Sequence, residues 1–379
     1  MKKHLSWYLI VLLGFGLACC LGIYWWLELD FATGLGVAVA TLCAVLPLPW
    51  LLARPIVLWR AASQARAQGI SLSDKNIVAE LADIDTLVVS RRGTITSGRP
   101  YIAEMIPEGL SRGALISMAA AAEQGATHPI GQAIVKFAHD HELKLPTPTA
   151  VNEVPGQGVE SIVNRFPVRV GRPEWLQREG IELDAAYLTR ADQLSARGRQ
   201  PIFVANGQYI RGILVFDDDI SRETVHAIHA LQREGLRVVV LTADNQRLAH
   251  ATEKHTNVDT AQGNLTPAAK AQEVQNLRLH GETVAVLAEP EQEDAALMQA
   301  DLALPGLTLT ELAHLLPLSQ RATQIIRQNR RLAVIFSLLL LIPATGLLYT
   351  FGGPFLPPLF AAISLAVICL LISVNSLRV

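Results

Sequence analysis

The chain has 379 residues and a formal net charge of −2; half of its residues are hydrophobic and 17% are charged. This composition allows a large soluble enzyme or a membrane protein with a soluble insert. The near-neutral balance gives no reason to expect a nucleic-acid partner. The distribution of charges along the chain therefore has to decide between the two classes.

Charged residues are missing from three long stretches, two near the N-terminus and one at the C-terminus. They are Ser6–Leu27, Phe31–Ala53 and Leu332–Leu377, and the last is interrupted at 352–354 by a Gly-Gly-Pro sequence. A membrane helix needs about 20 apolar residues, so the C-terminal stretch is long enough for two. We predict four transmembrane helices, two at each end of the chain.

Basic residues flank these stretches, whereas the connectors 28–30 and 350–357 contain no Lys or Arg. The positive-inside rule then predicts a multi-pass protein of the inner (cytoplasmic) membrane, with both termini and the soluble body in the cytoplasm. An alternative interpretation of the first twenty residues is a signal peptide with lipid attachment at Cys19. The flanking residues are Lys2, Lys3, Arg54, Arg60, Arg66, Arg327, Arg330, Arg331 and Arg378.

The soluble body, about 72–316, alternates short β-branched runs with amphipathic stretches, which is typical of a parallel sheet flanked by helices. The clearest expected strands are 86–90, 236–241, 282–287 and 300–304. A second block of helices and strands follows the first strand and includes a hairpin around Asn206-Gly207. We therefore expect a doubly wound α/β domain interrupted by an inserted α+β domain.

Several short motifs follow one another in a characteristic order along the chain. They are Ile84–Val89 leading into Gly93-Thr94, Thr127-His128-Pro129, Gly156-Gln157-Gly158, Asp219 with Arg222, Thr242–Asn245, Pro267 with Lys270, Ala296-Leu297 with Ala300-Asp301, and Asn375–Arg378. Taken together in this order, they resemble the heavy-metal P-type ATPases. The resemblance covers nearly the whole chain and starts at the family's third core transmembrane helix, so we expect no counterpart here of the earlier helices, the metal-binding leader and the actuator domain.

The resemblance implies a division of the chain into four parts. Residues 1–71 would contain two transmembrane helices and a cytoplasmic stalk. Residues 72–100 and 213–320 would form a phosphorylation-type domain of the HAD-like fold, and 101–212 the inserted nucleotide-binding-type domain. Residues 321–379 would contain the other two transmembrane helices.

The phosphorylation loop departs from the family pattern. The family attacks the γ-phosphate of ATP with the aspartate of a DKTGT loop, whereas this loop reads Ser90-Arg91-Arg92-Gly93-Thr94. Serine is a weak nucleophile without a neighbouring base, and none is evident in the motif. Two guanidinium groups would also compete with Mg²⁺ for the site.

The metal-holding loop is altered as well. The family's GDGxNDxPAL becomes 288–297 here, with Glu289 and Glu293 at the aspartate positions and Pro290 at a glycine. Longer side chains on a stiffened turn should miss the octahedral geometry that Mg²⁺ requires, so we expect no bound Mg²⁺. A solvated acidic loop is the simpler interpretation, and residual metal binding is the alternative.

Four remnants of the family's phosphoryl site survive, namely Asp219, Thr242, Asp244 and Lys270. In the family such residues orient and neutralise the phosphoryl group. Without the nucleophile they cannot transfer it, so we expect them to cap turns and pair charges at the sheet edge.

The nucleotide motif is better preserved. The family binds adenine and phosphates with Ser-Glu-His-Pro and a GxG turn; His128, Pro129, Gly156 and Gly158 are present, while Thr127 replaces the glutamate. Pro129 is also a natural first residue of a helix, so folding explains part of the motif. The resemblance leaves ATP as the one candidate ligand.

The membrane ion site has lost its ligands. The family's Cys-Pro-Cys aligns with Leu46-Pro47-Leu48, which retains the proline and neither sulfur. Cys43 with Cys369 could supply displaced ligands, but a cysteine in an apolar span is ordinarily a small hydrophobic residue. All four cysteines, including Cys19 and Cys20, lie in apolar spans without CxxC spacing, so no disulfide or zinc site is indicated.

These losses together predict a membrane-embedded pseudo-ATPase that is a structural, assembly or regulatory subunit of a membrane complex, without ATP-driven transport. One alternative is a split metal-cation pump completed by another chain. The other is a nucleotide sensor, in which ATP binding changes the soluble domains and thereby a membrane partner.

Overall fold

The computed structural model describes residue 14 and residues 30–72, 74–154, 156–287, 299–354 and 356–379. The chain divides into two units, Met1–Asp83 with Leu315–Val379, and Ile84–His314. The expected span Ser6–Leu27 and the acidic loop 288–297, with Glu289 and Glu293, lie outside the described residues.

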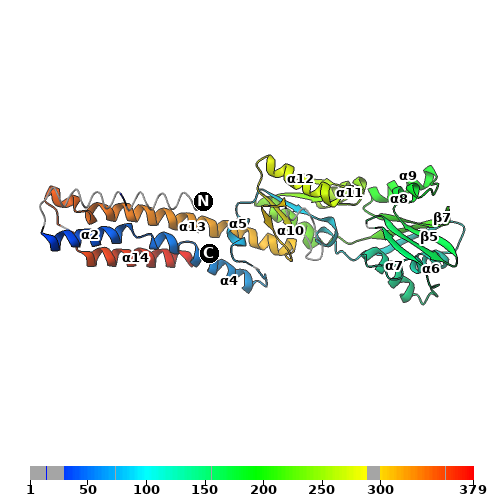
Figure 1. Ribbon diagram of the computed structural model, residues 1–379, viewed down its shortest axis with the longest axis horizontal. Helices are drawn as coiled ribbons and strands as arrows, with labels where there is room; N and C mark the ends of the chain where they lie inside the picture. Colours follow the sequence, from blue (N-terminus) through cyan, green and yellow to red (C-terminus); the bar gives the residue numbers. More distant parts are fainter. Residues whose placement is uncertain (1–13, 15–29, 73, 155, 288–298, 355) are drawn as a thin grey trace. The chain divides into compact units, whose positions relative to one another are not determined.

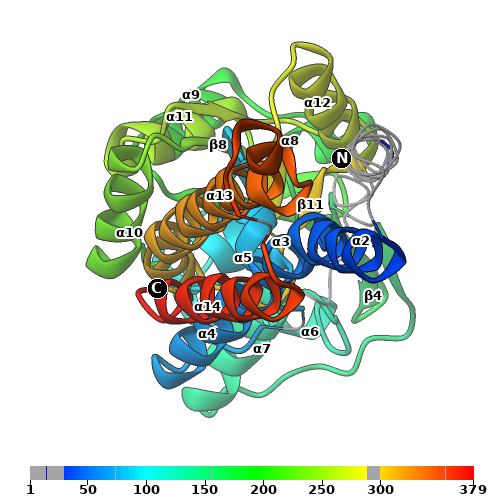
Figure 2. The same ribbon diagram turned by 90° about the vertical axis from the view of Figure 1, so that its left-hand side faces the viewer.

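The first unit is helical, and α2, α13 and α14 run side by side in it (Figures 1 and 2). Apolar residues of all three helices form one core, which includes Ala40, Leu341 and Ala361. The helices are α2 (Phe31–Val45), α3 (Leu48–Leu52), α4 (Pro55–Ala67), α5 (Ile77–Leu81), α13 (Leu309–Ala344), the short η3 (Leu347–Phe351) and α14 (Pro358–Ser376).

Polar contacts join these helices at specific points. The Thr41 hydroxyl donates to the Ala344 carbonyl at 3.0 Å, which ties α2 to the end of α13. Asn329 of α13 donates from Nδ2 to the Ser376 hydroxyl of α14 at 2.9 Å, and both residues are fully buried. Buried polar groups of this kind are stable because they satisfy one another.

Two helical stretches in the described residues are long and apolar enough to cross a membrane, Phe31–Ala67 and Pro358–Ser376. The third expected span belongs to the longer helix α13, in which Arg327, Arg330 and Arg331 precede the apolar part. α13 ends at Ala344, before the Gly352-Gly353 break that we expected to separate the two C-terminal spans. The number of four transmembrane helices therefore stays a prediction.

The second unit contains a five-stranded sheet in the order β11-β10-β1-β8-β9, all parallel. Its strands are β1 (Thr86–Val89), β8 (Arg237–Leu241), β9 (Thr260–Gln262), β10 (Val284–Leu287) and β11 (Leu302–Ala303). The four expected strands are confirmed as β1, β8, β10 and β11, each with one to three residues fewer than expected. All residues of β1 and β10 are buried, as parallel strands covered on both faces should be.

Three helices accompany these strands in the chain: α10 (Arg222–Arg233) precedes β8, α11 (Gln246–Thr256) follows β8, and α12 (Pro267–Leu279) follows β9. Val274 of α12 packs on Val88, Val239 and Val286, which form one apolar face of the sheet. Because the strands are parallel, the loops after β1 and β8 meet at the same edge, and this edge carries the candidate site.

The inserted domain is a six-stranded antiparallel sheet in the order β2-β7-β6-β5-β4-β3 (Figure 1). The strands are β2 (Tyr101–Pro107), β3 (Val151–Val154), β4 (Gly158–Val163), β5 (Phe166–Gly171), β6 (Gln200–Asn206) and β7 (Tyr209–Asp217). The predicted hairpin is present, with Asn206 opposite Tyr209.

Alternate residues of β6 and β7 pack on opposite faces, because successive side chains of a strand point to opposite sides. Ile202 and Val204 pack on α6 (Arg112–Ala122) and α7 (Pro129–Asp140). Phe203 and Ala205 pack on α8 (Pro173–Arg178) and α9 (Ala185–Ala196).

The expected end of the insert at residue 212 is wrong. It falls inside β7, whose residues up to Asp217 still pair with β2. The first strand of the insert and its last are therefore neighbours, and the chain returns to the parallel sheet only after Asp217. This is a long-range pairing, which a local hydrophobic pattern does not reveal.

Candidate functional site

Ion pairs join the loop after β1 to Asp244, in the loop after β8. Ser90 directly follows β1 and precedes the turn η1 (Arg91–Ile95), in which Gly93 has a φ of 71°. Arg92 Nη2 lies 2.6 Å from Asp244 Oδ1, and Arg91 Nη1 lies 3.3 Å from Oδ2. Both oxygens of the Asp244 carboxylate are therefore occupied by guanidinium groups.

Asp244 is held in place by its own loop as well. The Thr242 hydroxyl donates to Asp244 Oδ2 at 3.1 Å, and the backbone N–H of Asp244 donates to the Thr242 oxygen at 3.1 Å. Burial alone would raise the pKa of Asp244, but the positive charges of Arg92 and Arg91 outweigh it and hold the pKa well below its usual range. The carboxylate is ionised at neutral pH.

Arg91 is an interior residue. Its side chain is 4% exposed, and Nε donates to the Thr252 hydroxyl of α11 at 3.1 Å. A buried cation of this kind needs its counter-ion, because an unpaired charge away from water is strongly unfavourable.

The other two charged remnants of the phosphoryl site, Asp219 and Lys270, lie outside the group of ion pairs around Asp244 in the described part of the chain. Asp219 accepts from the Tyr101 hydroxyl at 3.4 Å, and Lys270 lies in the first turn of α12. The adjacent Asp218 is the buried carboxylate: it accepts from the hydroxyls of Thr96 at 2.5 Å and Ser97 at 2.7 Å. Asp218, which the sequence did not single out, therefore fastens the end of the Ser90 loop.

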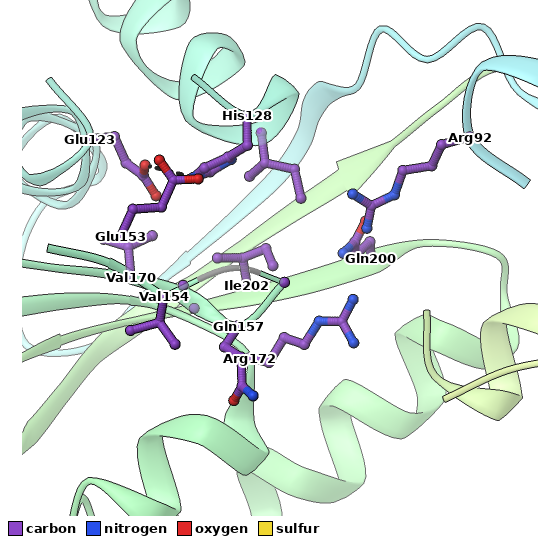
Figure 3. A pocket seen from close by; sticks show the side chains of 14 residues that line it. Arg92, Glu123, His128, Glu153, Val154, Gln157, Val170, Arg172, Gln200 and Ile202 are labelled. Atoms are coloured by element: carbon purple, nitrogen blue, oxygen red, sulfur yellow. Dashed lines mark hydrogen bonds and ion pairs between the residues drawn. The ribbon is translucent and has the colours of Figure 1, made fainter. Parts of the chain in front are cut away.

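The nucleotide-type residues gather around a cavity of about 170 Å³ in the inserted domain (Figure 3). His128, Gly156 and Gly158 line it, whereas Pro129 does not and instead begins α7. The full lining is Arg92, Glu123, His128, Ile130, Glu153, Val154, Gly156, Gln157, Gly158, Val170, Gly171, Arg172, Gln200 and Ile202.

His128 is fixed by two contacts. Its Nδ1 accepts the backbone N–H of Gly131 at 3.0 Å, which caps α7, and its Nε2 lies 3.1 Å from Glu123 Oε2. The hydrogen bond to Glu123 raises the pKa of His128, and burial raises the pKa of Glu123. Since Nδ1 accepts a hydrogen bond, the proton of the neutral ring belongs on Nε2, where it can be donated to the carboxylate.

The two positions of the turn, 156 and 158, favour glycine for different physical reasons. Gly156 has a φ of 73°, a conformation that favours glycine, and a Cβ there would meet open space. A Cβ at Gly158 would collide with the carbonyl of Val170 and come within 2.6 Å of the Trp175 ring. Close packing therefore requires Gly158 whether or not a ligand is bound.

Arg172 connects the cavity with the Asp244 loop. It follows β5, donates Nη1 to the Ala243 carbonyl at 2.8 Å, and places Nη2 3.7 Å from Asp244 Oδ1. Burial lowers the pKa of Arg172 from its ordinary value. Arg92 and Arg172 thus line the cavity and contact the same carboxylate.

Sequence reasoning missed Glu123, Asp218 and Arg172. Glu123 had a weak signal, an isolated acid directly after the run Ala119–Ala122 of a buried helix. Arg172 had none, because its partner is 72 residues away in the chain and in another sheet.

The membrane ion position is a break between two helices. α2 ends at Val45 and α3 begins at Leu48, with Leu46 and Pro47 between them. Leu48 is exposed, and Cys43 packs beside the α2–α13–α14 core. In the described part of the chain, no group of three His, Cys, Asp or Glu side chains could hold a metal ion.

Comparison with known proteins agrees with this architecture. A family model for haloacid dehalogenase-like hydrolases matches residues 91–287. The silver-exporting P-type ATPase of Salmonella typhimurium is 30% identical over 374 residues, or 93% of this chain and 45% of that protein. Copper-transporting ATPase 1 of Rhizobium meliloti is 28% identical over 90% of this chain and 43% of its own. The chain spans about half the length of these relatives.

Solved structures share the fold. A zinc-transporting PIB-type ATPase in its E2.Pi state superimposes with a TM-score of 0.69 at 24% identity, over 97% of this chain and 62% of the other. The catalytic domain of the CPx-ATPase CopB-B gives a TM-score of 0.52 at 21% identity, over 68% and 98%. From the motifs, the parallel sheet with its insert and these matches together, the chain belongs to the heavy-metal P-type ATPase family.

Proposed function

We propose that this chain is a P-type ATPase-like pseudoenzyme of the inner membrane, a regulatory subunit that binds a nucleotide without hydrolysing it. The observation that carries the proposal is the ion pairing at Asp244. A phosphorylation site has to admit Mg²⁺ and a γ-phosphate beside a nucleophilic carboxylate. Here Ser90 replaces the carboxylate, and Arg91 and Arg92 cover both oxygens of Asp244.

Mg²⁺ requires oxygen ligands in near-octahedral geometry and does not share a carboxylate with two guanidinium groups at bonding distance. Displacing them would leave the interior Arg91 without its counter-ion, which costs several kcal/mol. The resting arrangement thus opposes metal binding as well as phosphoryl transfer.

The cavity at His128 supports the nucleotide-binding part of the proposal. Its walls combine apolar residues, Ile130, Val170 and Ile202, with charged groups at the two ends. Apolar walls together with placed polar groups that fix the orientation of a ligand are the usual parts of a small-molecule site.

The test measures binding and turnover on the same sample. The full chain, purified in mild detergent, is titrated with ATP by calorimetry, and phosphate release is followed with and without Mg²⁺. We expect saturable binding with release no faster than the buffer control. Mg²⁺-dependent release above the control, abolished by Asp244→Asn, would favour the split pump instead.

The proposed regulatory role requires a membrane partner. Copurification from mild detergent, followed by mass spectrometry with and without ATP, tests it. We expect an integral membrane protein whose recovery changes with nucleotide; recovery of the chain alone under both conditions would contradict the regulatory role.

A further inference from the structure

The charges around the cavity are separated into two ends. Figure 3 shows His128, Glu123 and Glu153 on one side, while the guanidinium groups of Arg92 and Arg172 extend toward the other. A ligand that fits such a site has hydrogen-bonding groups at one end and negative charge at the other.

The basic end carries more positive charge than its partner balances. Arg91, Arg92 and Arg172 lie within 3.7 Å of one carboxylate, Asp244, the only one in ion-pair contact with them among the described residues. One negative charge shared by three cations leaves an excess of two positive charges next to a cavity. Such an excess attracts an anion, and the forked geometry of arginine suits phosphate oxygens.

Arg92 and Arg172 are also able to change partners. Their side chains are 35% and 25% exposed, respectively, whereas Arg91 is almost fully buried. Arg92 additionally contacts Gln200 Oε1 at 3.4 Å, on the cavity side. Arg91 can therefore keep Asp244 neutralised while the other two arginines turn to a ligand.

We propose that Arg92 and Arg172 form the phosphate-binding end of this pocket, with Asp244 as the counter-ion they hold until a di- or triphosphate chain replaces it. The inference rests on the proposed nucleotide site and deepens it, because it assigns recognition of the phosphate chain to arginines that follow Ser90 and β5. It implies that binding strengthens with phosphate number and needs no Mg²⁺. It also couples the ligand to the contact between insert and parallel sheet, since Arg172 belongs to one and Asp244 to the other.

The experiment titrates the full chain in detergent with adenosine, AMP, ADP, ATP and inorganic tripolyphosphate, in EDTA, by calorimetry. We expect ATP to bind about tenfold or more tightly than adenosine, which corresponds to one charge-assisted hydrogen bond. Arg92→Gln and Arg172→Gln should each weaken ATP about tenfold and leave adenosine within about twofold. Asp244→Asn should tighten ATP, because the phosphates no longer compete with a carboxylate.

The matched control is Arg247→Gln. Arg247 pairs with Asp192 at 2.8 Å and so also joins α11 to the insert, but it does not line the cavity. It should leave all affinities unchanged. If Asp244→Asn does not fold, the two arginine variants still decide the question.

Each of the following results would contradict the inference, the nucleotide site or both. If adenosine and ATP bind with equal affinity, or if the arginine variants bind ATP as tightly as the wild type does, the phosphate-binding inference is wrong and the nucleotide site is not affected. Tripolyphosphate binding that depends on both arginines, without any nucleoside binding, overturns the nucleotide site alone. Absence of binding by all five ligands overturns both.

Discussion

Arg91 and Asp244 form an ion pair of 3.3 Å between side chains that are 4% and 1% exposed. The pair joins the loop after β1 to the loop after β8, at the edge where the family places its chemistry. An interior pair of this kind contributes little compared with apolar packing, yet removing one partner is costly.

Asp244→Asn should therefore destabilise the second unit by about 3 kcal/mol, because it leaves Arg91 buried without a negative charge. A domain of this size loses roughly 2–4 °C in Tm per kcal/mol, so thermal unfolding of the full chain in detergent should show a large decrease. The control is Asp192→Asn, which breaks an exposed pair with Arg247 and should cost less than about 0.5 kcal/mol. Similar changes for the two variants would contradict the interior role of Asp244.

Replacing Gly158 and Gly156 by alanine should separate packing from backbone strain. Gly158→Ala forces a methyl group against Val170 and Trp175 and should cost about 2–3 kcal/mol, with loss of ATP binding. Gly156→Ala meets no neighbour and should cost only about 1 kcal/mol for its positive φ. Unfolding and calorimetric titration measure both effects. Equal costs would mean that the Gly158 contact is not tight.

The Glu123–His128 pair should make the second unit less stable as the pH rises. The pKa of His128 is raised above its usual 6.5, mainly by the hydrogen bond to Glu123. The negative charges of Glu123 and Glu153 raise it further, whereas burial and the positive charge of Arg92 lower it. A raised pKa means that its stability contribution is fully present below about pH 6.5 and is lost as the pH rises through the raised value.

Thermal unfolding at pH 6 and pH 8 tests this linkage. We expect the wild type to lose about 2 °C more in Tm over this range than Glu123→Gln, in which an uncharged amide replaces the carboxylate. Subtracting the pH dependence of Glu123→Gln from that of the wild type removes every contribution that does not depend on Glu123. An identical pH dependence for the two proteins would remove His128 as its source.

The membrane segment should bind no Cu⁺ or Zn²⁺ stoichiometrically, because Leu46 and Leu48 offer no ligand atoms. Metal analysis of the purified chain after dialysis should find less than about 0.1 ion per chain, and Cys43→Ala should not change this. One ion per wild-type chain that is lost in Cys43→Ala would establish the displaced thiol site instead.

Ser90→Asp alone should not restore ATP hydrolysis. The new carboxylate adjoins Arg91 and Arg92, which already pair with both oxygens of Asp244. From the sequence we also expect Pro290, at a glycine position of the family, to disfavour the loop conformation that binds Mg²⁺. Steady-state phosphate release measures the outcome. The comparison is the variant that also carries Arg91→Lys, Arg92→Thr, Glu289→Asp and Pro290→Gly. From this variant we expect phosphate label on the chain in a single-turnover experiment, but no steady-state phosphate release. Clear turnover from the single substitution would contradict the coordinated loss.

Much of the fold was predictable because local sequence carries it. The β-branched runs at 86–89 and 237–241 are strands, and Asn206-Gly207 makes a hairpin, because these residues disfavour other conformations. The motif also brought together His128, Gly156 and Gly158, and all three line the same cavity. Their role in nucleotide binding stays a proposal.

The missing parts depend on contacts between distant segments. The insert continues to Asp217 because β7 pairs with β2. In this pairing Tyr101 lies opposite Asp217, which is 116 residues later in the chain. The pairing of Arg92 and Arg172 with Asp244 joins three loops that no local pattern connects. For the same reason Asp218, and not Asp219, proved to be the buried carboxylate of its loop.

The most direct test of the pseudoenzyme assignment is an acyl-phosphate assay. The purified full chain is incubated with γ-labelled ATP and Mg²⁺ and quenched with acid, and the label on the chain is measured before and after hydroxylamine treatment. We predict ATP binding in a parallel titration and no covalent label, because Ser90 offers no carboxylate and Arg91 and Arg92 pair with both oxygens of Asp244. Acid-stable label that hydroxylamine removes would demonstrate an acyl-phosphate and contradict the assignment as a pseudoenzyme.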